Sequence, residues 1–440
     1  MFTRCIALLL CISLASCGGG GSDDDDSEAF RTTFTYFLTT GNTAISGRIF
    51  RIMGEGDMTL IQTQTGINQT AGLGFISGIV LDGTDTAIAG VTIQAHNDSG
   101  LAAGSIFYQS ALTGAYTVGL TQTTTTGRFV VMNVQPGRVN IKCAAGADGN
   151  LYVQVPTGTT VFAQIRPTAS GLQPTWSGVT QNLGAAGSAL PGSPEASVNY
   201  QLVGTTSAPG PASDGTTGAF NLGTVPARNT FLMKCAKTAF VDTYTYIRTL
   251  NANLTSGGGG GNVLITSPTN RDTELVATGV VLAAGTGIIR GRVMDGAGGF
   301  VVQARNSSDA VVGEVAYGDN ADNGRPSAVL TSTQTDGIFY VYNVPPGQVF
   351  LRATKTGQSV STYVDVFADG ITLPLDLEPV IQTQTTISVS GALADLRGFG
   401  VPEGTVALQG LGLSDSSDSF GEFSNPSVPA AHVFIVRTSK

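Results

Sequence analysis

The sequence has few of the side chains on which most enzyme sites depend. Its 440 residues include two histidines, His96 and His432, and one tryptophan, Trp176. Histidine is the most common general base and a frequent metal ligand, so a catalytic or zinc site built on several histidines is excluded. The sequence also lacks the motifs G-x-S-x-G, H-E-x-x-H and G-x-x-x-x-G-K-[ST]. We therefore expect a protein that is not an enzyme and has no cofactor and no metal site.

Charged residues are scarce as well. They make up 12% of the chain, whereas a typical soluble domain has about 25%. The net charge is −9 and the five lysines form no cluster. Nucleic-acid binding needs a basic face, so DNA and RNA are excluded as partners.

Glycine and threonine are abundant instead, with 59 and 55 residues. Both are poor helix formers, and threonine favours strands. Because 41% of the residues are hydrophobic, the chain is not a disordered polar polymer. The composition predicts an all-β fold.

The first 16 residues are typical of a signal peptide. Arg4 precedes an apolar run from Cys5 to Leu14, which is too short to span a bilayer as a helix. The run ends in Leu-Ala-Ser-Cys17, which resembles the lipobox of bacterial lipoproteins. That resemblance implies that Cys17 carries lipid and anchors the protein to a bacterial envelope membrane. The alternative is an ordinary signal peptide that happens to contain Cys17.

Residues 17–29 contain four consecutive glycines and four consecutive aspartates. Glycine-rich chain is flexible and acidic runs extend by self-repulsion, so we expect a tether between the lipid and the folded part. Position 18 is glycine rather than aspartate, which by analogy with the lipoproteins of enteric bacteria implies the outer membrane, at its periplasmic face or at the surface.

One phrase recurs along the rest of the chain. It reads GRFVVMNVQPGRVNIKCAA from Gly127 and GIFYVYNVPPGQVFLRATK from Gly337, and looser copies begin at Gly218 and Gly421. A short apolar strand around one glycine precedes each copy. In the first copy, alternation places Phe129 and Val131 on one strand face and Val130 and Met132 on the other. Many short strands separated by Gly and Pro turns predict β-sandwiches.

These phrases resemble the carboxypeptidase regulatory-like domain, a transthyretin-like (prealbumin-like) sandwich of seven strands. The residues that carry the resemblance are Gly78, Val80, Asp82, Gly127, Phe129, Asn133, Val134, Pro136 and Gly137 in copy one, and Gly291, Val293, Asp295, Gly337, Phe339, Asn343, Val344, Pro345, Pro346 and Gly347 in copy three. The resemblance implies tandem antiparallel Greek-key β-sandwich domains. These motif residues specify turns and core positions, and none of them is catalytic.

The predicted organisation follows from the repeats. It comprises the signal peptide (1–16), the tether (17–29), an unassigned β-rich segment (30–70), sandwich 1 (71–170), a divergent sandwich 2 (171–284), sandwich 3 (285–380) and a partial sandwich 4 (381–440). Copy four has no room for two closing strands. Either it is partial or strands from elsewhere complete it. The segment 30–70 holds the strand-like stretches TFTYFLTT, AISGRIFRI and MTLIQTQT.

Two sets of residues are candidate sites. Cys143 and Cys235 occupy equivalent places in two copies, a domain length apart, so we expect two small core residues rather than a disulfide. The pairs Tyr340 and Tyr342, and Tyr244 and Tyr246, alternate with core residues. Exposed, they would form a ligand platform for a sugar or a protein partner. The other interpretation is that they pack against neighbouring strands or domains.

Together these features predict a non-enzymatic cell-envelope lipoprotein whose sandwiches act as stalk, adhesion or scaffold modules. Its partners would be the membrane, through Cys17, and a protein or polysaccharide of the envelope. The alternative is a carbohydrate-binding surface protein that uses the tyrosines, since the fold overlaps with starch-binding-like sandwiches.

Overall fold

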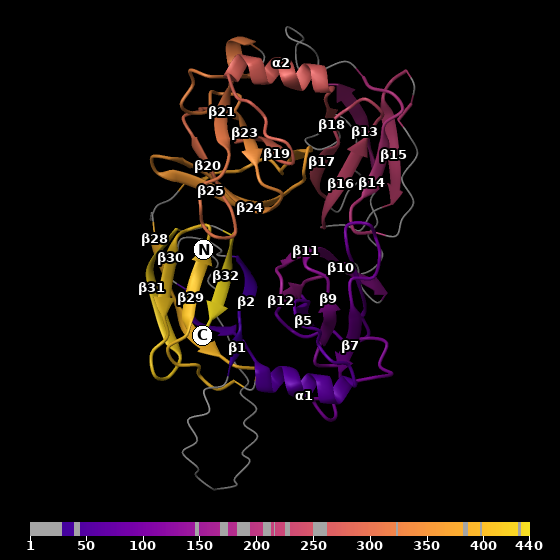
Figure 1. Cartoon of the computed structure of the whole chain (residues 1–440), viewed down its shortest axis with the longest axis vertical. Coiled ribbons are helices and arrows are strands. Elements are labelled where there is room, and N and C mark those ends of the chain that lie inside the picture. The colour runs from indigo at the N-terminus through magenta and orange to yellow at the C-terminus, as the bar shows by residue number, and fades with distance from the viewer. Residues whose placement is uncertain are drawn as a thin grey trace, which may run out of the picture.

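The computed structural model describes residues 29–38, 45–145, 149–167, 175–182, 194–205, 213–214, 216–224, 229–249, 262–322, 324–381, 386–396, 398–429 and 433–440. They form four β-sandwiches in a closed two-by-two arrangement (Figure 1). The prediction of an all-β protein built of tandem sandwiches is confirmed.

Domain 1 defines the unit. One of its sheets has the order β12-β5-β9-β7-β8 and the other has the order β11-β10-β6. Its strands are β5 (Gly74–Val80), β6 (Thr92–His96), β7 (Ser105–Gln109), β8 (Tyr116–Thr117), β9 (Arg128–Val134), β10 (Gly137–Ala145), β11 (Gly149–Val155) and β12 (Thr160–Ile165).

Domains 2 and 3 repeat this unit. In each, the first strand of the domain lies between the strand that carries the repeated phrase and the last closing strand, as β5 lies between β9 and β12 in domain 1. Domain 2 contains β13 (Thr175–Asn182), β14 (Asn199–Leu202), β15 (Ala219–Thr224), β16 (Thr230–Ala236), β17 (Thr243–Arg248) and β18 (Asn262–Ile265). Domain 3 contains β19 (Gly287–Arg292), β20 (Val301–Arg305), β21 (Glu314–Asp319), a 3-10 turn (Asn320–Asp322), β22 (Arg325–Ser327), β23 (Ile338–Val344), β24 (Gly347–Lys355), β25 (Gln358–Val366), β26 (Ile371–Leu373) and β27 (Val380–Ile381).

One detail of the predicted topology is wrong. The first and closing strands pair in parallel, as β5 does with β12, so the sandwiches are not purely antiparallel. The two closing strands, β11 and β12, belong to different sheets. The turn between them carries the chain from one sheet to the other.

Domain 4 is completed by the N-terminal segment. Its strands β28 (Thr386–Ala394), β29 (Thr405–Gln409), β30 (Leu413–Ser416), β31 (Glu422–Pro429) and β32 (Val433–Ser439) are joined by β2 (Thr33–Leu38) and β3 (Ile45–Arg51). Strand β2 pairs with β32, and β3 pairs in parallel with β28. Phe50 and Ile52 are buried in the core of domain 4. Residues 30–54 therefore provide the two closing strands that the fourth repeat lacks.

The domains are joined by shared sheets. Strand β2 of domain 4 also pairs in parallel with β12 of domain 1, and β17 of domain 2 pairs in the same way with β26 of domain 3. Each pair of domains thus shares one continuous sheet of eight or nine strands. The chain consists of two similar halves, which pair domain 4 with domain 1 and domain 2 with domain 3.

A helix covers each shared sheet. Helix α1 (Glu55–Thr65) follows β4 (Met53–Gly54), which pairs with β1 (Phe30–Arg31), and α2 (Pro268–Thr278) precedes domain 3. They lie at opposite ends of the molecule (Figure 1). The prediction of a strand over MTLIQTQT is wrong, because this stretch is helical. Met58, Ile61 and Thr65 are buried on one face of α1, a spacing typical of an amphipathic helix.

The repeated motif has a physical role in copies one and three. A Cβ on Gly78 would lie 2.0 Å from the Phe129 ring, and one on Gly291 would lie 2.2 Å from Phe339, so only glycine fits under the motif phenylalanine. Asn133 has a φ of 57°, and its Oδ1 accepts a hydrogen bond from the Thr70 N–H at 2.7 Å. The motif asparagine therefore fixes the loop that leads from the helix into the sandwich.

The completion of domain 4 can be tested with two isoleucines of the N-terminal segment. Ile52 is fully buried, whereas Ile49 is 53% exposed. We expect Ile52→Ala to lower the free energy of unfolding by about 2–5 kcal/mol because it leaves a cavity. Ile49→Ala should change it by less than about 0.5 kcal/mol. Denaturant unfolding measures both, and equal effects would contradict the assignment of residues 30–54 to this core.

Candidate functional site: the central junction

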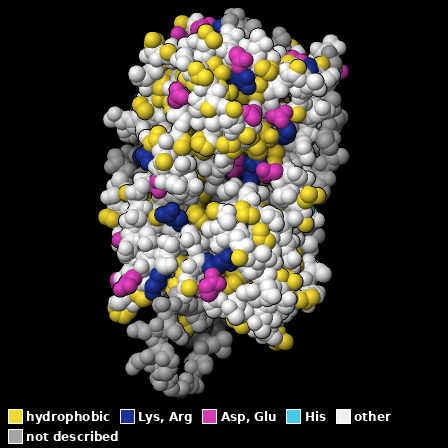
Figure 2. Space-filling view, viewed as in Figure 1, with side chains coloured by type: hydrophobic (Ala, Val, Ile, Leu, Met, Phe, Trp, Pro, Cys, Tyr) yellow, Lys and Arg dark blue, Asp and Glu magenta, His cyan; other side chains and the backbone are white. Residues whose placement is uncertain are grey.

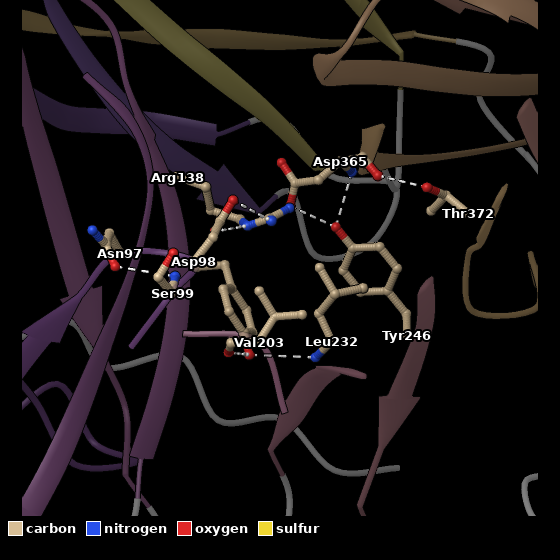
Figure 3. A network of polar contacts seen from close by, with 10 residues as sticks. Asn97, Asp98, Ser99, Arg138, Val203, Leu232, Tyr246, Asp365 and Thr372 are labelled. Atoms are coloured by element: carbon tan, nitrogen blue, oxygen red, sulfur yellow. Dashed lines mark hydrogen bonds and ion pairs between the residues drawn. The ribbon is translucent and has the colours of Figure 1, made fainter. Parts of the chain in front are cut away.

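Three domains meet at a buried polar cluster, here called the central junction (Figure 3). It consists of Asp98, Arg138 and Tyr152 from domain 1, Tyr246 from domain 2 and Asp365 from domain 3. Arg138 directly follows the motif glycine at the start of β10. Asp98 lies at the tip of a turn that Asn97 shapes, since Asn97 Oδ1 accepts from the N–H groups of Ser99 and Leu101.

Arg138 bridges two carboxylates. Its Nε donates to Asp98 Oδ1 at 2.9 Å, and its Nη2 lies 2.8 Å from Asp98 Oδ2. Its Nη1 lies 3.3 Å from Asp365 Oδ2. The guanidinium also stacks over the Phe367 ring, 4.2 Å from its centroid. The side chains of Arg138 and Asp365 are only 5% and 7% exposed, so this ion pair is shielded from water.

Tyrosine hydroxyls bring domain 2 into the cluster. Tyr246 Oη donates to Asp365 Oδ2 at 2.7 Å and accepts from the Asp365 N–H at 2.9 Å. Tyr152 Oη donates to the Val203 carbonyl at 2.7 Å and accepts from the Leu232 N–H at 3.4 Å. Thr372 adds a hydrogen bond to the Asp365 carbonyl at 2.9 Å. The hydroxyls of Tyr246 and Tyr152 thus satisfy buried groups across the boundaries of domain 2 with domains 3 and 1.

The environment fixes the protonation of these groups. Burial alone would lower the pKa of Arg138, but Asp365 and Asp98 outweigh it and raise that pKa above its usual value. Burial raises the pKa of Tyr246 well above its usual value, and Asp365 adds to the effect. Burial also raises the pKa of Tyr152 to about 12. At neutral pH the arginine is charged and both tyrosines keep the proton that they donate.

The equivalent position in the other half of the molecule is built differently. Tyr363 takes the place of Tyr152, accepting from the Ile435 N–H at 2.7 Å and donating to the Gln409 carbonyl at 2.9 Å. Gln348 and Gln154 stand where Arg138 and Asp365 stand at the central junction. They line a cavity of about 300 Å³ between domains 1, 3 and 4. The ion network therefore fills a space that the other half leaves open.

The predicted tyrosine platform does not exist as an exposed surface. Tyr340 and Tyr342 are 2% and 1% exposed, and Tyr244 is 9% exposed. Tyr340 and Tyr342 occupy the face of β23 that packs under α2, together with Leu275. Tyr244 stacks on Phe367 with a centroid distance of 3.4 Å. Packing against a neighbouring element, the other interpretation of these residues, explains all three positions.

The structure places the remaining predicted residues as follows. Cys143 and Cys235 are both buried and form no disulfide with each other, as the sequence predicts for two core residues. Cys17 and His432 lie outside the described residues. Tyr246, predicted as a platform residue, belongs instead to the central junction. Within the described ranges, no group of three or more His, Cys, Asp or Glu side chains could hold a metal ion.

No protein-family profile and no curated protein matches the sequence. Similar solved structures include the Bacillus anthracis TIE protein, which is 13% identical over 70% of this chain with a TM-score of 0.18. The match spans about half of that protein (51%). A streptococcal ancillary pilin is 10% identical over 80% of this chain and 99% of its own, with a TM-score of 0.17. A DUF3823 family protein from Bacteroides uniformis is 12% identical over 68% and 99%, with a TM-score of 0.14. These values do not assign the chain to a family.

The contribution of the central junction to the free energy of unfolding can be measured by substitution. Arg138→Met leaves Asp98 and Asp365 without their cation, and we expect it to lower the free energy of unfolding by about 3–5 kcal/mol. The control is Arg166→Met, since Arg166 pairs with Asp85 at the surface, where the side chains are 46% and 65% exposed. That loss should stay below about 1 kcal/mol. If both variants unfold at the same denaturant concentration, the junction does not hold the domains together.

Proposed function

We propose that the chain is a non-enzymatic, lipid-anchored scaffold protein of the bacterial cell envelope. The observation that carries this proposal is the central junction. It joins three domains through the ion pair between Arg138 and Asp365 and through the hydrogen bonds of Tyr246 and Tyr152. A buried ion network of this kind holds a fixed geometry between domains, which is what a scaffold requires.

The arrangement favours a rigid block over an extended stalk. In a stalk, each domain touches only its neighbours along the chain. Here domain 4 shares a sheet with domain 1 through β2 and β12, and Asp365 of domain 3 binds Arg138 of domain 1. We infer a module that presents fixed surfaces to a protein or polysaccharide of the envelope.

The sandwiches are proposed to be carboxypeptidase regulatory-like domains. This assignment is supported by the motif residues Gly78 and Phe129, whose close packing explains their spacing. The turn at Pro136 and Gly137 carries the chain from β9 in one sheet to β10 in the other. A motif that sets turns and core packing fits a structural role and assigns no chemistry.

Membrane attachment is proposed to occur through lipid on Cys17, as the lipobox-like sequence at residues 14–17 implies. Among the described residues, no helix is long and apolar enough to cross a membrane. The anchor and the tether at residues 17–29 precede β1, so the lipid would be joined to the body beside domain 4 and α1.

The anchor is tested by Cys17→Ala in cells. We expect the wild-type protein to fractionate with membranes and to take up labelled fatty acid, and the variant to lose both properties. Cys143→Ala is the matched control, because that buried thiol is no anchor, and it should behave like the wild type. Unchanged membrane fractionation of Cys17→Ala would contradict the proposal.

A further inference from the structure

One end of the molecule carries exposed apolar side chains from α1 and from turns of domains 1 and 4. Leu60 lies on α1, Leu112 and Val118 lie in domain 1, and Phe399 and Phe420 lie in domain 4. Their exposed fractions are 54%, 94%, 71%, 68% and 78%. We call these five residues the apolar end.

Hydrogen bonds place these residues around one helix. Gln64 of α1 accepts from the Tyr116 N–H at 2.9 Å, which holds the segment with Leu112 and Val118 beside the helix. Asp57 of α1 accepts from the Leu396 N–H at 3.2 Å. That bond holds the turn with Phe399 at the other end of the helix.

The two phenylalanines are neighbours in space. Phe399 closes a turn in which its N–H binds Asp395 Oδ1 at 2.8 Å. A Cβ on Gly400 would lie 2.0 Å from the Phe420 carbonyl oxygen, so the turn with Phe420 packs directly against this one. Two exposed phenyl rings therefore project from adjacent turns.

The proposed lipid tether reaches the body at this same end. The Ala29 carbonyl accepts from the Glu55 N–H at 2.9 Å, at the first residue of α1. The thirteen residues from Cys17 to Ala29 can span at most about 45 Å in any conformation. A lipid on Cys17 would thus keep the membrane surface within reach of the apolar end.

We propose that the apolar end is a membrane-contact surface, in which Phe399 and Phe420 enter the interface of the bilayer that holds the anchor. Phenyl and leucyl groups favour that zone, where their apolar area leaves water. The exposed acids Asp418 and Glu422 lie beside Phe420, so the surface suits zwitterionic rather than anionic headgroups. This inference rests on the lipid anchor proposed above.

The opposite end offers a matched control. Around α2 the exposed apolar side chains are the smaller Val276, Val281 and Val329, with exposed fractions of 83%, 84% and 84%. Val329 is as exposed as the phenylalanines. It follows β22, which contacts α2, and α2 and α1 lie at opposite ends of the molecule (Figure 1). Trp176 is 1% exposed in domain 2 and gives a constant fluorescence background.

The test uses lipidated protein carrying Phe420→Trp or Val329→Trp on phosphatidylcholine–phosphatidylethanolamine vesicles with brominated acyl chains. We expect bromine to remove roughly half of the added emission of Phe420→Trp, with a blue shift, and to leave Val329→Trp unchanged. Equal quenching of the two variants, or none at Phe420→Trp, would overturn the proposal.

Flotation of the vesicles separates this result from the anchor itself. Protein that does not float has no lipid anchor, and this would refute the proposed attachment through Cys17. In that case a hexahistidine segment in place of residues 18–23 holds the same variants on vesicles with a nickel-chelating lipid. Quenching confined to Phe420→Trp then supports the contact surface, and its absence refutes it.

Discussion

Strand β2 is hydrogen-bonded on both sides, and the closed arrangement of the four domains depends on this pairing. On one side it pairs with β32, near the end of the chain, and on the other it pairs with β12 of domain 1. All six residues of β2 pair with β32 and complete domain 4, and the first three, residues 33–35, also pair with β12 and attach domain 4 to domain 1. Without β2, domain 4 would lose a closing strand, and the sheet shared with domain 1 would be divided.

The shared sheets also explain how a chain with so little charge protects the edges of its sheets from pairing with other chains. Exposed edges invite pairing with other chains, and proteins often protect them with charged residues. Here the pairs β2–β12 and β17–β26 cover two edges with strands of the neighbouring domain. Few charged side chains appear on the face shown in Figure 2.

Several features of the fold could be predicted from sequence because they are local. Alternation correctly divided β9, with Phe129 and Val131 in the sandwich core and Val130 and Met132 under α1. The apolar second face of this strand was a signal that something covers it. The same signal at Tyr340 and Tyr342 allows two interpretations, an exposed platform or packing under a neighbouring element, and α2 is the element that covers them. Ser267 caps that helix and Pro268 begins it, a start signal that the sequence does contain.

The central junction could not be predicted, since its residues come from three domains and share no local pattern. Asp98 and Asp365 are far apart in sequence and meet only when the halves of the chain close. One clue was available: copy one has Arg138 where copy three has Gln348, directly after the motif glycine. The pairing of residues 30–54 with domain 4 could not be predicted from sequence for a similar reason. Their partners lie at the far end of the chain, and no repeat phrase marks them.

Hydrogen exchange of the β2 backbone tests the closure of the molecule most directly. Residues 33–35 lie between β32 and β12 in the nine-stranded sheet, so their amides should exchange as slowly as those of β5, which lies between β12 and β9. Fast exchange of residues 33–35, at the rate of an exposed edge or an unpaired segment, would contradict the account.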